Sequence, residues 1–248
     1  MKNSNLITEL NQFFMVKNFR DYAPNGLQVE GKETIKKILT AVSASEAAID
    51  AAIANKADAL FVHHGYFWKG EASEIVSIKR NRLKKLLENN INLIAYHLPL
   101  DQHPKYGNNI LFGQAIEARN IRQSACEELI WHGEINSMTI EQLSQKLTSV
   151  LNRNPMMVGA LLEKVVTKIA WCTGAAQDFL AQAVKEDAEV FISGEYAERT
   201  YHEAKELGIA YFSCGHHATE RFGVKKMVEV FQDEFSIEAS FFDEANPF

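Results

Sequence analysis

The sequence has few cysteines, no excess of basic residues and no long apolar run, and each absence excludes a class of protein. Its three cysteines lack a C-x-x-C spacing, which argues against a disulfide framework or a cysteine zinc site and is typical of a reducing compartment. The net charge of −6 counts against a general nucleic-acid surface, because phosphate binding requires an excess of lysine and arginine. No stretch approaches the roughly 20 apolar residues that span a bilayer, and the amino-terminal segment with Glu9 does not have the pattern of a signal peptide. We therefore expect a soluble, cytoplasmic protein without membrane contacts.

Apolar and amphipathic segments alternate along most of the chain. The 248 residues are 46% hydrophobic and 23% charged, which is enough for one large or two small domains with real cores. The pattern predicts strands at 36–43, 57–62, 91–96 and 208–214, and helices at 4–15, 44–55, 76–89 and 108–118. Such alternation is typical of an α/β fold with mostly parallel sheets, whose sites lie at the carboxyl ends of the strands.

An internal repeat divides the chain. Residues 37–64 align without a gap with residues 168–195, and each block consists of a strand, a helix of small residues and a second strand. We therefore expect two pseudo-symmetric α/β halves within one unit of 248 residues. The predicted division is a first half at 1–120, a connecting segment at 121–165 and a second half at 166–248.

The connecting segment breaks the alternation of strands and helices. It contains a predicted strand near 127–132 and a predicted helix near 139–152. Thr139 followed three residues later by Gln142 is the pattern of a capping box at the start of that helix. We interpret the segment as an inserted connection rather than a separate domain.

Histidines and carboxylates follow three of the predicted strands. Histidine, aspartate and glutamate bind first-row divalent metals, and such a set can hold two ions bridged by a carboxylate or a hydroxide. The alternative, polar turns that cap the following helices, does not explain why three strands end in the same residue types. The residues are His63 and His64 after the strand at 57–62, His97 and Asp101 after 91–96, and His216 and Glu220 after 208–214.

The two adjacent histidines constrain the local chain path. Neighbouring residues on a strand point to opposite faces, so His63 and His64 converge on one site only if the strand ends there and the chain turns. Gly65 permits such a turn. In the repeat, this pair falls opposite Gly194 and Glu195, which predicts a metal site between the two halves.

The two later motifs share a spacing of four residues. His216 and Glu220 are expected on one face near the first turn of a helix, where both reach one ion. Pro99 argues against a helix between His97 and Asp101. His97 is therefore either a ligand or a residue that orients Asp101.

Two further segments carry alternative interpretations. The aromatic run Tyr66-Phe67-Trp68 beside the histidine pair stacks a flat base at the mouth of the site, or it packs in the core or in a subunit contact. The basic residues between Lys79 and Lys85 form a local basic patch, or simply the solvated face of a helix.

Taken together, five motifs resemble the dinuclear-metal family known as GTP cyclohydrolase I type 2 or Ngg-interacting-factor-like proteins, in its short enterobacterial-type subgroup. The resemblance covers nearly the full chain. The motifs, in order, are APNGLQV at 23–29, VHHG at 62–65, HLPLD at 97–101, ISGE at 192–195 and GHHATE at 215–220.

The resemblance implies two α/β halves, a pair of metal ions between them and a ring-shaped homohexamer, a toroid. It implies two divalent ions per subunit, of Fe, Mn, Zn or Mg, and metal ligands at His63, His64, Asp101, His216 and Glu220. Many members carry histidines shortly after the motif equivalent to ISGE, whereas this chain has Glu198 and Arg199 there, with His202 a few residues later.

The function that this resemblance implies is that of a metal-dependent, cyclohydrolase-like hydrolase. It would act on a nucleotide- or pterin-like small molecule through a metal-activated water, with His97 or a nearby acid as the proton carrier. The alternative is a non-catalytic ring that stores, delivers or senses metal, or serves as a scaffold for partners. A third hypothesis, a ring that threads DNA, rests on the implied annular shape alone, and the acidic net charge counts against it.

Overall fold

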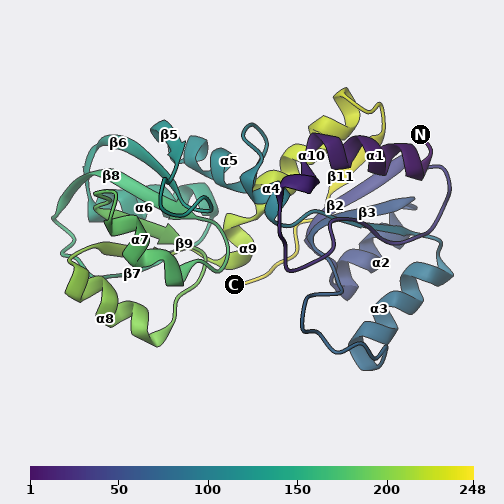
Figure 1. Cartoon of the computed structure of the whole chain (residues 1–248), viewed down its shortest axis with the longest axis horizontal. Helices are drawn as coiled ribbons and strands as arrows, with labels where there is room; N and C mark the ends of the chain where they lie inside the picture. Colours follow the sequence, from purple (N-terminus) through teal and green to yellow (C-terminus); the bar gives the residue numbers. More distant parts are fainter. The chain divides into compact units, whose positions relative to one another are not determined.

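The computed structural model describes all 248 residues and contains two compact units, each with its own β-sheet (Figure 1). Unit 1 consists of Met1–Tyr106 and Gly223–Ala245, and unit 2 consists of Gly107–Phe222 and Asn246–Phe248. The fold is mixed α/β, which confirms the predicted class. None of its helices combines the length and the apolar character needed to cross a membrane.

The sheet of unit 1 has five strands, and all neighbours run parallel except β1 and β4, which are antiparallel. In spatial order the strands are β1 (Gly26–Val29), β4 (Asn92–Ala95), β3 (Ala59–His64), β2 (Lys37–Ser43) and β11 (Glu238–Phe241). The helices are α1 (Asn3–Phe13), α2 (Glu46–Ala54), α3 (Ser77–Glu88), α4 (Leu98–Gln102) and most of α10 (Arg221–Asp233), with a 3₁₀ turn, η1 (Val16–Asn18).

Alternate residues of these strands face two different cores. One face packs against α1 and α10, as with Phe61 against Phe231, and the other packs against α2 and α3, as with Leu60 near Leu86. Figure 1 shows these two pairs of helices on opposite sides of the sheet. Because β3 is buried on both faces, its sequence is a continuous apolar run rather than an alternating one.

The sheet of unit 2 has six strands and is mixed, because only β8 with β9 and β9 with β10 are parallel pairs. In spatial order the strands are β5 (Arg119–Gln123), β6 (Trp131–Thr139), β8 (Val165–Cys172), β9 (Val190–Ser193), β10 (Ala210–Ser213) and β7 (Met156–Val158). The helices are α5 (Asn108–Ala115), α6 (Ile140–Leu151), α7 (Leu180–Val184), α8 (Glu198–Leu207) and α9 (His216–Thr219), with a 3₁₀ turn, η2 (Gln177–Phe179).

The boundaries of the two units differ from the predicted division at 1–120, 121–165 and 166–248. The segment interpreted as a connection contributes β5, β6, α6 and β7 to the sheet and core of unit 2, because β6 pairs antiparallel with β8. The strand expected near 127–132 begins at Trp131 and continues to Thr139. The carboxyl-terminal β11 pairs with β2 and so belongs to unit 1. The capping box of Thr139 and Gln142 is confirmed, with both reciprocal hydrogen bonds formed.

The aligned blocks of the repeat have the same strand register in each unit. Asp58 Oδ2 accepts two consecutive backbone N–H groups at the start of β2, at 2.9 and 3.0 Å. Glu189 Oε2 accepts the equivalent pair, the N–H groups of Thr167 and Lys168 within β8, at 2.8 and 2.9 Å. The corresponding parallel pairs are Ile38 with Ala59 and Ile169 with Val190.

These two carboxylates are expected to stabilise their units by a similar amount. Asp58→Ala or Glu189→Ala leaves two strand N–H groups without their acceptor, which costs about 1–3 kcal/mol of the free energy of unfolding. Asp233→Ala, at an exposed position near the end of α10, is the control and is expected to change it by less than about 0.5 kcal/mol. Urea titrations followed by circular dichroism measure all three. A loss no larger than that of the control would contradict the prediction.

Candidate metal centre

Three histidines of unit 1 converge beyond the carboxyl ends of β3 and β4. His63, His64 and His97 each offer one ring nitrogen, and these atoms lie within 4.8 Å of one another. The ring centroids are 4.5 Å apart for His63 and His64, and 5.0 Å apart for His63 and His97. Three imidazole nitrogens this close together form a ligand set typical of a divalent transition metal.

Hydrogen bonds fix the orientation of the two adjacent rings. The Nδ1 atom of His63 lies 3.1 Å from the carbonyl oxygen of Tyr96, so Nδ1 carries the proton and Nε2 is the ligand atom. That Nε2 lies 3.5 Å from Oδ1 of Asp101, which places a carboxylate beside the buried ring. The Nδ1 atom of His64 lies 3.1 Å from Oγ of Ser43. Metal-binding histidines are usually oriented by such contacts.

Gly65 is required for space rather than for a left-handed backbone. A Cβ atom at this position would lie 2.1 Å from Oε1 of Gln28 and 2.7 Å from Cβ of Ala95. The same Oε1 accepts the backbone N–H of Tyr66 at 2.7 Å. The glycine thus lets the segment after His64 pack closely against β1 and β4.

The aromatic run after the histidine pair has two environments. Tyr66 is buried, and its hydroxyl donates to the carbonyl oxygen of Ala44 at 2.6 Å, so it packs in the core. The side chain of Phe67 is exposed. Trp68 lies beside the histidines, with its ring centroid 4.9 Å from that of His97 and 6.0 Å from that of His64.

The expectation that Pro99 prevents a helix between His97 and Asp101 is wrong. Helix α4 begins at Leu98, and Pro99 lies in its first turn, where a backbone N–H needs no partner within the helix. The carbonyl oxygen of His97 accepts the N–H groups of Leu100 and Asp101 at 2.8 and 3.2 Å. The short helix thereby holds Asp101 one turn beyond His97.

Sequence reasoning did not identify Asp21, which contacts His97. Its Oδ1 atom lies 2.7 Å from Nδ1 of His97, and its Oδ2 accepts from the side chain of Asn25 and from the backbone N–H of Leu98, both at 2.9 Å. Asp21 lies in an irregular segment. The only sequence feature that pointed to this segment was the neighbouring APNG motif, whose Asn25 donates to Asp21. Burial by itself would raise the pKa of Asp21, but the hydrogen bond and attraction of His97 and the other donors lower it from 3.8 to about 2.

Asp21→Asn is expected to destabilise the protein in a pH-dependent manner. Because the folded pKa of Asp21 lies below the ordinary value, its contribution is fully present above about pH 4 and is lost as the pH falls toward 2. Allowing for solvent screening, the variant should lose about 1–2 kcal/mol at pH 7 and little near pH 2. Urea titrations at both pH values measure the difference. A loss that is the same at both would contradict the assignment.

His216 and Glu220 of unit 2 form a second pair of ligand groups. Their atoms Nε2 and Oε2 lie 3.0 Å apart, and Nδ1 of His216 lies 2.6 Å from Oε1 of Glu195. Burial would lower the pKa of His216, but the carboxylates of Glu220 and Glu195 raise it to about 9. Both predicted residues therefore lie together, as their spacing indicated, although α9 ends at Thr219 and Glu220 lies at the junction with α10.

Glu198, Arg199 and His202, which follow the ISGE motif, lie on α8. His202 Nε2 lies 3.1 Å from Oε1 of Glu198, and Arg199 is paired with Asp178. His202 and Glu198 are both largely exposed. These side chains are engaged with one another and with η2 rather than with His216.

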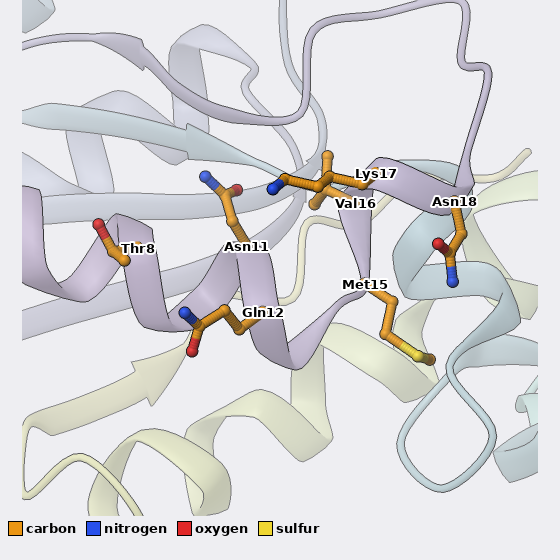
Figure 2. A pocket seen from close by; sticks show the side chains of 7 residues that line it. All are labelled: Thr8, Asn11, Gln12, Met15, Val16, Lys17 and Asn18. Atoms are coloured by element: carbon orange, nitrogen blue, oxygen red, sulfur yellow. The ribbon is translucent and has the colours of Figure 1, made fainter.

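Cavities occur in both units, but their linings differ in chemistry. A cavity of about 480 Å³ in unit 1 is lined by α1 and η1, whose contributing side chains are shown in Figure 2. It contains amides, aliphatic groups and one lysine, with no histidine or carboxylate. In unit 2 a cavity of about 540 Å³ lies beside His216 and Glu195. The second cavity therefore adjoins candidate metal ligands, whereas the first offers none.

The fold and these side chains define a two-unit α/β protein with histidine and carboxylate groups that could hold a divalent metal. The chain belongs to the Duf34/NIF3 (NGG1p interacting factor 3) family, whose model matches residues 1–247. It is 42% identical over 248 residues to a Yersinia pestis protein and 43% identical over 249 residues to one from Escherichia coli K12, covering all of each chain. Both relatives are named GTP cyclohydrolase 1 type 2 homolog.

Solved structures of similar proteins confirm the fold. A structure of protein ybgI, described as of unknown function, matches with a TM-score of 0.97 and 42% identity over all of both chains. TTHA1606 from Thermus thermophilus matches with a TM-score of 0.89 and 30% identity, also over all of both chains. The family predicted from the five motifs is thus confirmed.

Proposed function

We propose that the protein binds two divalent metal ions and hydrolyses a nucleotide- or pterin-like small molecule. The proposed ligands are His63, His64, Asp101, His216 and Glu220. The observation that carries the proposal is the histidine cluster of unit 1, in which ligand nitrogens of His63 and His64 lie within 4.8 Å of each other and of a ring nitrogen of His97, and the Nδ1 atoms of the two ligands are engaged by neighbouring groups. The names of the curated relatives support the cyclohydrolase-like reaction class.

The donor set fits divalent ions of Fe, Mn, Zn or Mg. Imidazole nitrogens favour the transition metals, and the carboxylates of Asp101 and Glu220 offset the positive charge of the ions. Both carboxylates are buried, at 7% and 2% exposure, where a counter-charge is most valuable. When bound, such ions lower the pKa of a coordinated water and polarise the bond to be attacked.

His97 is the proposed proton carrier. Its Nδ1 is held by Asp21 at 2.7 Å, which leaves Nε2 as the atom that exchanges a proton with the substrate or with water. The neighbouring indole of Trp68 is positioned to pack against a flat heterocycle. Asp21 is thus a positioning residue, because it holds the ring of His97 and does not itself contact the substrate.

Metal content and turnover together test the proposal. Plasma mass spectrometry of protein purified without chelators should find near two ions per chain. The loaded protein should turn over at least one member of a panel of GTP, phosphoesters and cyclic amides with Mn, Fe, Zn or Mg. Exchangeable metal without any turnover would favour the alternative, a metal-handling or scaffold protein. No metal as purified and none taken up afterwards would overturn both.

We further propose that the chain assembles into a homohexameric ring, as the family resemblance implies. Unit 2 exposes large apolar side chains close together in sequence, with Leu161 at 77%, Leu162 at 46% and Val165 at 55% exposure. Exposed apolar groups that recur in one segment are typical of a contact between copies. Light scattering should give six times the chain mass of 28.0 kDa, and a monomeric mass would exclude the ring.

A further inference from the structure

The cavity beside His216 is lined by an arginine, Arg153, that has no part in the proposed metal site. Its volume of about 540 Å³ lies within the range of small-molecule sites. The lining includes Arg153, Glu195, Tyr196, Ser213 and His216, all of unit 2. A ligand that fills this cavity would contact both a candidate metal ligand and the guanidinium group of Arg153.

The local backbone fixes the place of Arg153. Helix α6 ends at Leu151, its C-cap residue Asn152 has a left-handed conformation with φ of 55°, and Arg153 follows directly. Its Nη1 donates to the carbonyl oxygen of Pro247 at 2.8 Å. No carboxylate oxygen lies within the 4.0 Å of an ion pair, and a guanidinium has five N–H donors in all. Arg153 thus donates a hydrogen bond to a backbone carbonyl and forms no ion pair with a carboxylate.

Gly215 lets this guanidinium lie against the backbone next to His216. A Cβ atom at Gly215 would be 2.0 Å from Nη1 and 2.6 Å from Cζ of Arg153. Gly215 also has a φ of +94°, so any other residue would be strained there. The glycine of the GHHATE motif therefore serves Arg153 as well as the start of α9.

The carboxylate of Glu195 in the same cavity does not neutralise Arg153. Its Oε1 atom lies 2.6 Å from Nδ1 of His216, and no ion pair joins it to Arg153. Arg153 therefore forms no ion pair with a side-chain carboxylate of the cavity, whose lining also includes Pro247 and Phe248. A cation of this kind at the wall of a cavity is the usual means of binding an oxyanion.

We propose that Arg153 binds an oxyanion, a phosphate or carboxylate group, of the molecule on which the protein acts. This proposal rests on the proposed function for the identity of that molecule as a substrate. The side chain of Tyr196, 56% exposed, lines this cavity and also an adjacent apolar one formed with Met156 and Val158. The substrate is therefore a small anion with an apolar or flat ring portion, held by its charged end beside His216.

Chemical modification of the wild-type protein tests the proposal directly. Phenylglyoxal modifies exposed guanidinium groups, and mass spectrometry of peptides gives the rate at each arginine. Millimolar inorganic phosphate should slow the modification of Arg153 about threefold or more, which corresponds to about two-thirds occupancy of a single site. Arg80, an exposed arginine of α3 without an acidic partner, is the internal control and should react at an unchanged rate.

A comparison of two anions and two variants distinguishes this site from the metal centre. Protection by phosphate alone would identify a phosphate ester, and protection by acetate as well would identify oxyanions in general; both support the proposal. Arg153→Gln should keep the metal content of the wild type. In His63→Ala the protection of Arg153 should persist. Equal rates with and without either anion, or protection that disappears in His63→Ala, would overturn the assignment, because the anion would then be absent or held by metal.

Discussion

Replacement of His63 with alanine, or of Asp101 with asparagine, is expected to lower the metal content from near two ions per chain to one or fewer. His63 is fully buried, and the carbonyl oxygen of Tyr96 fixes the orientation of its ring. Even the partners that merely orient a ligand cost 10–100-fold in metal affinity when removed, so loss of a ligand should cost at least about as much. Plasma mass spectrometry and competition with a chromophoric chelator measure both quantities.

The two variants differ in what they do to the fold. His63→Ala leaves a cavity in the core of unit 1 and should also cost about 2–4 kcal/mol of stability. Asp101→Asn keeps the shape of the side chain and removes its charge beside His63, so it should lose metal without unfolding. His202→Ala, an exposed histidine paired with Glu198, is the matched control and should keep the full metal content. Unchanged metal binding in Asp101→Asn would remove this carboxylate from the ligand set.

Loss of metal and loss of turnover should also scale together. If the proposed hydrolysis depends on the ions, Asp101→Asn should lower kcat/KM at a given total metal concentration by about 10-fold or more, and added metal should restore part of it. Asp21→Asn, in contrast, should keep its metal and lose part of kcat, because Asp21 contacts His97 rather than the ligands. The contrast distinguishes a metal-binding role from a proton-transfer role within unit 1.

The parts of the fold that the sequence predicts are those with strong local signals. The apolar run of β3 ends in His63 and His64 as expected, and the capping residues of α6 lie at Thr139 and Gln142. The spacing of His216 and Glu220 correctly predicts their contact at 3.0 Å. Each of these depends on residues close together in the chain, where periodicity and capping chemistry are sufficient.

The parts that it does not predict depend on pairing between distant segments. Strand β5 is polar and lies at a sheet edge, so its sequence has no apolar alternation to reveal it. Strand β11 joins the sheet of unit 1 through its pairing with β2, which lies near the opposite end of the chain, and no local pattern encodes that pairing. The predicted division at 1–120, 121–165 and 166–248 therefore differs from the boundaries of the two units.

The positioning residues of the candidate site escape sequence reasoning for a similar reason. Asp21 contacts His97 across 76 positions, and Arg153 reaches Pro247 across 94 positions. Neither residue lies at a strand end or in a recognisable ligand spacing. Aspartate and arginine are also common on surfaces, so their roles become visible only when their contacts and the cavity are known.

Gly174→Ala is expected to displace the carboxylate of Glu220 and to weaken metal binding by about 10-fold or more. A Cβ atom at Gly174 would lie 2.1 Å from Oε1 and 3.1 Å from Cδ of Glu220, and 3.3 Å from Nε2 of His216. Glu220 is 2% exposed and lies 3.0 Å from His216, so it has little room to move away. The backbone N–H of Gly174, which donates to Thr219 Oγ1 at 3.1 Å, also holds the strand end in place.

Gly208→Ala separates this displacement from simple backbone strain. Gly174 and Gly208 have nearly the same positive φ, +71° and +70°, but a Cβ atom at Gly208 would meet nothing within 4 Å. The left-handed strain of alanine, about 1 kcal/mol, is therefore common to both variants. Any further loss of stability or of metal in Gly174→Ala arises from the contact with Glu220. Thermal unfolding with and without metal measures both terms: metal should stabilise Gly208→Ala as it does the wild type and should stabilise Gly174→Ala much less. Equal stabilisation of the two variants would show that Glu220 tolerates displacement, and it would count against Glu220 as a ligand.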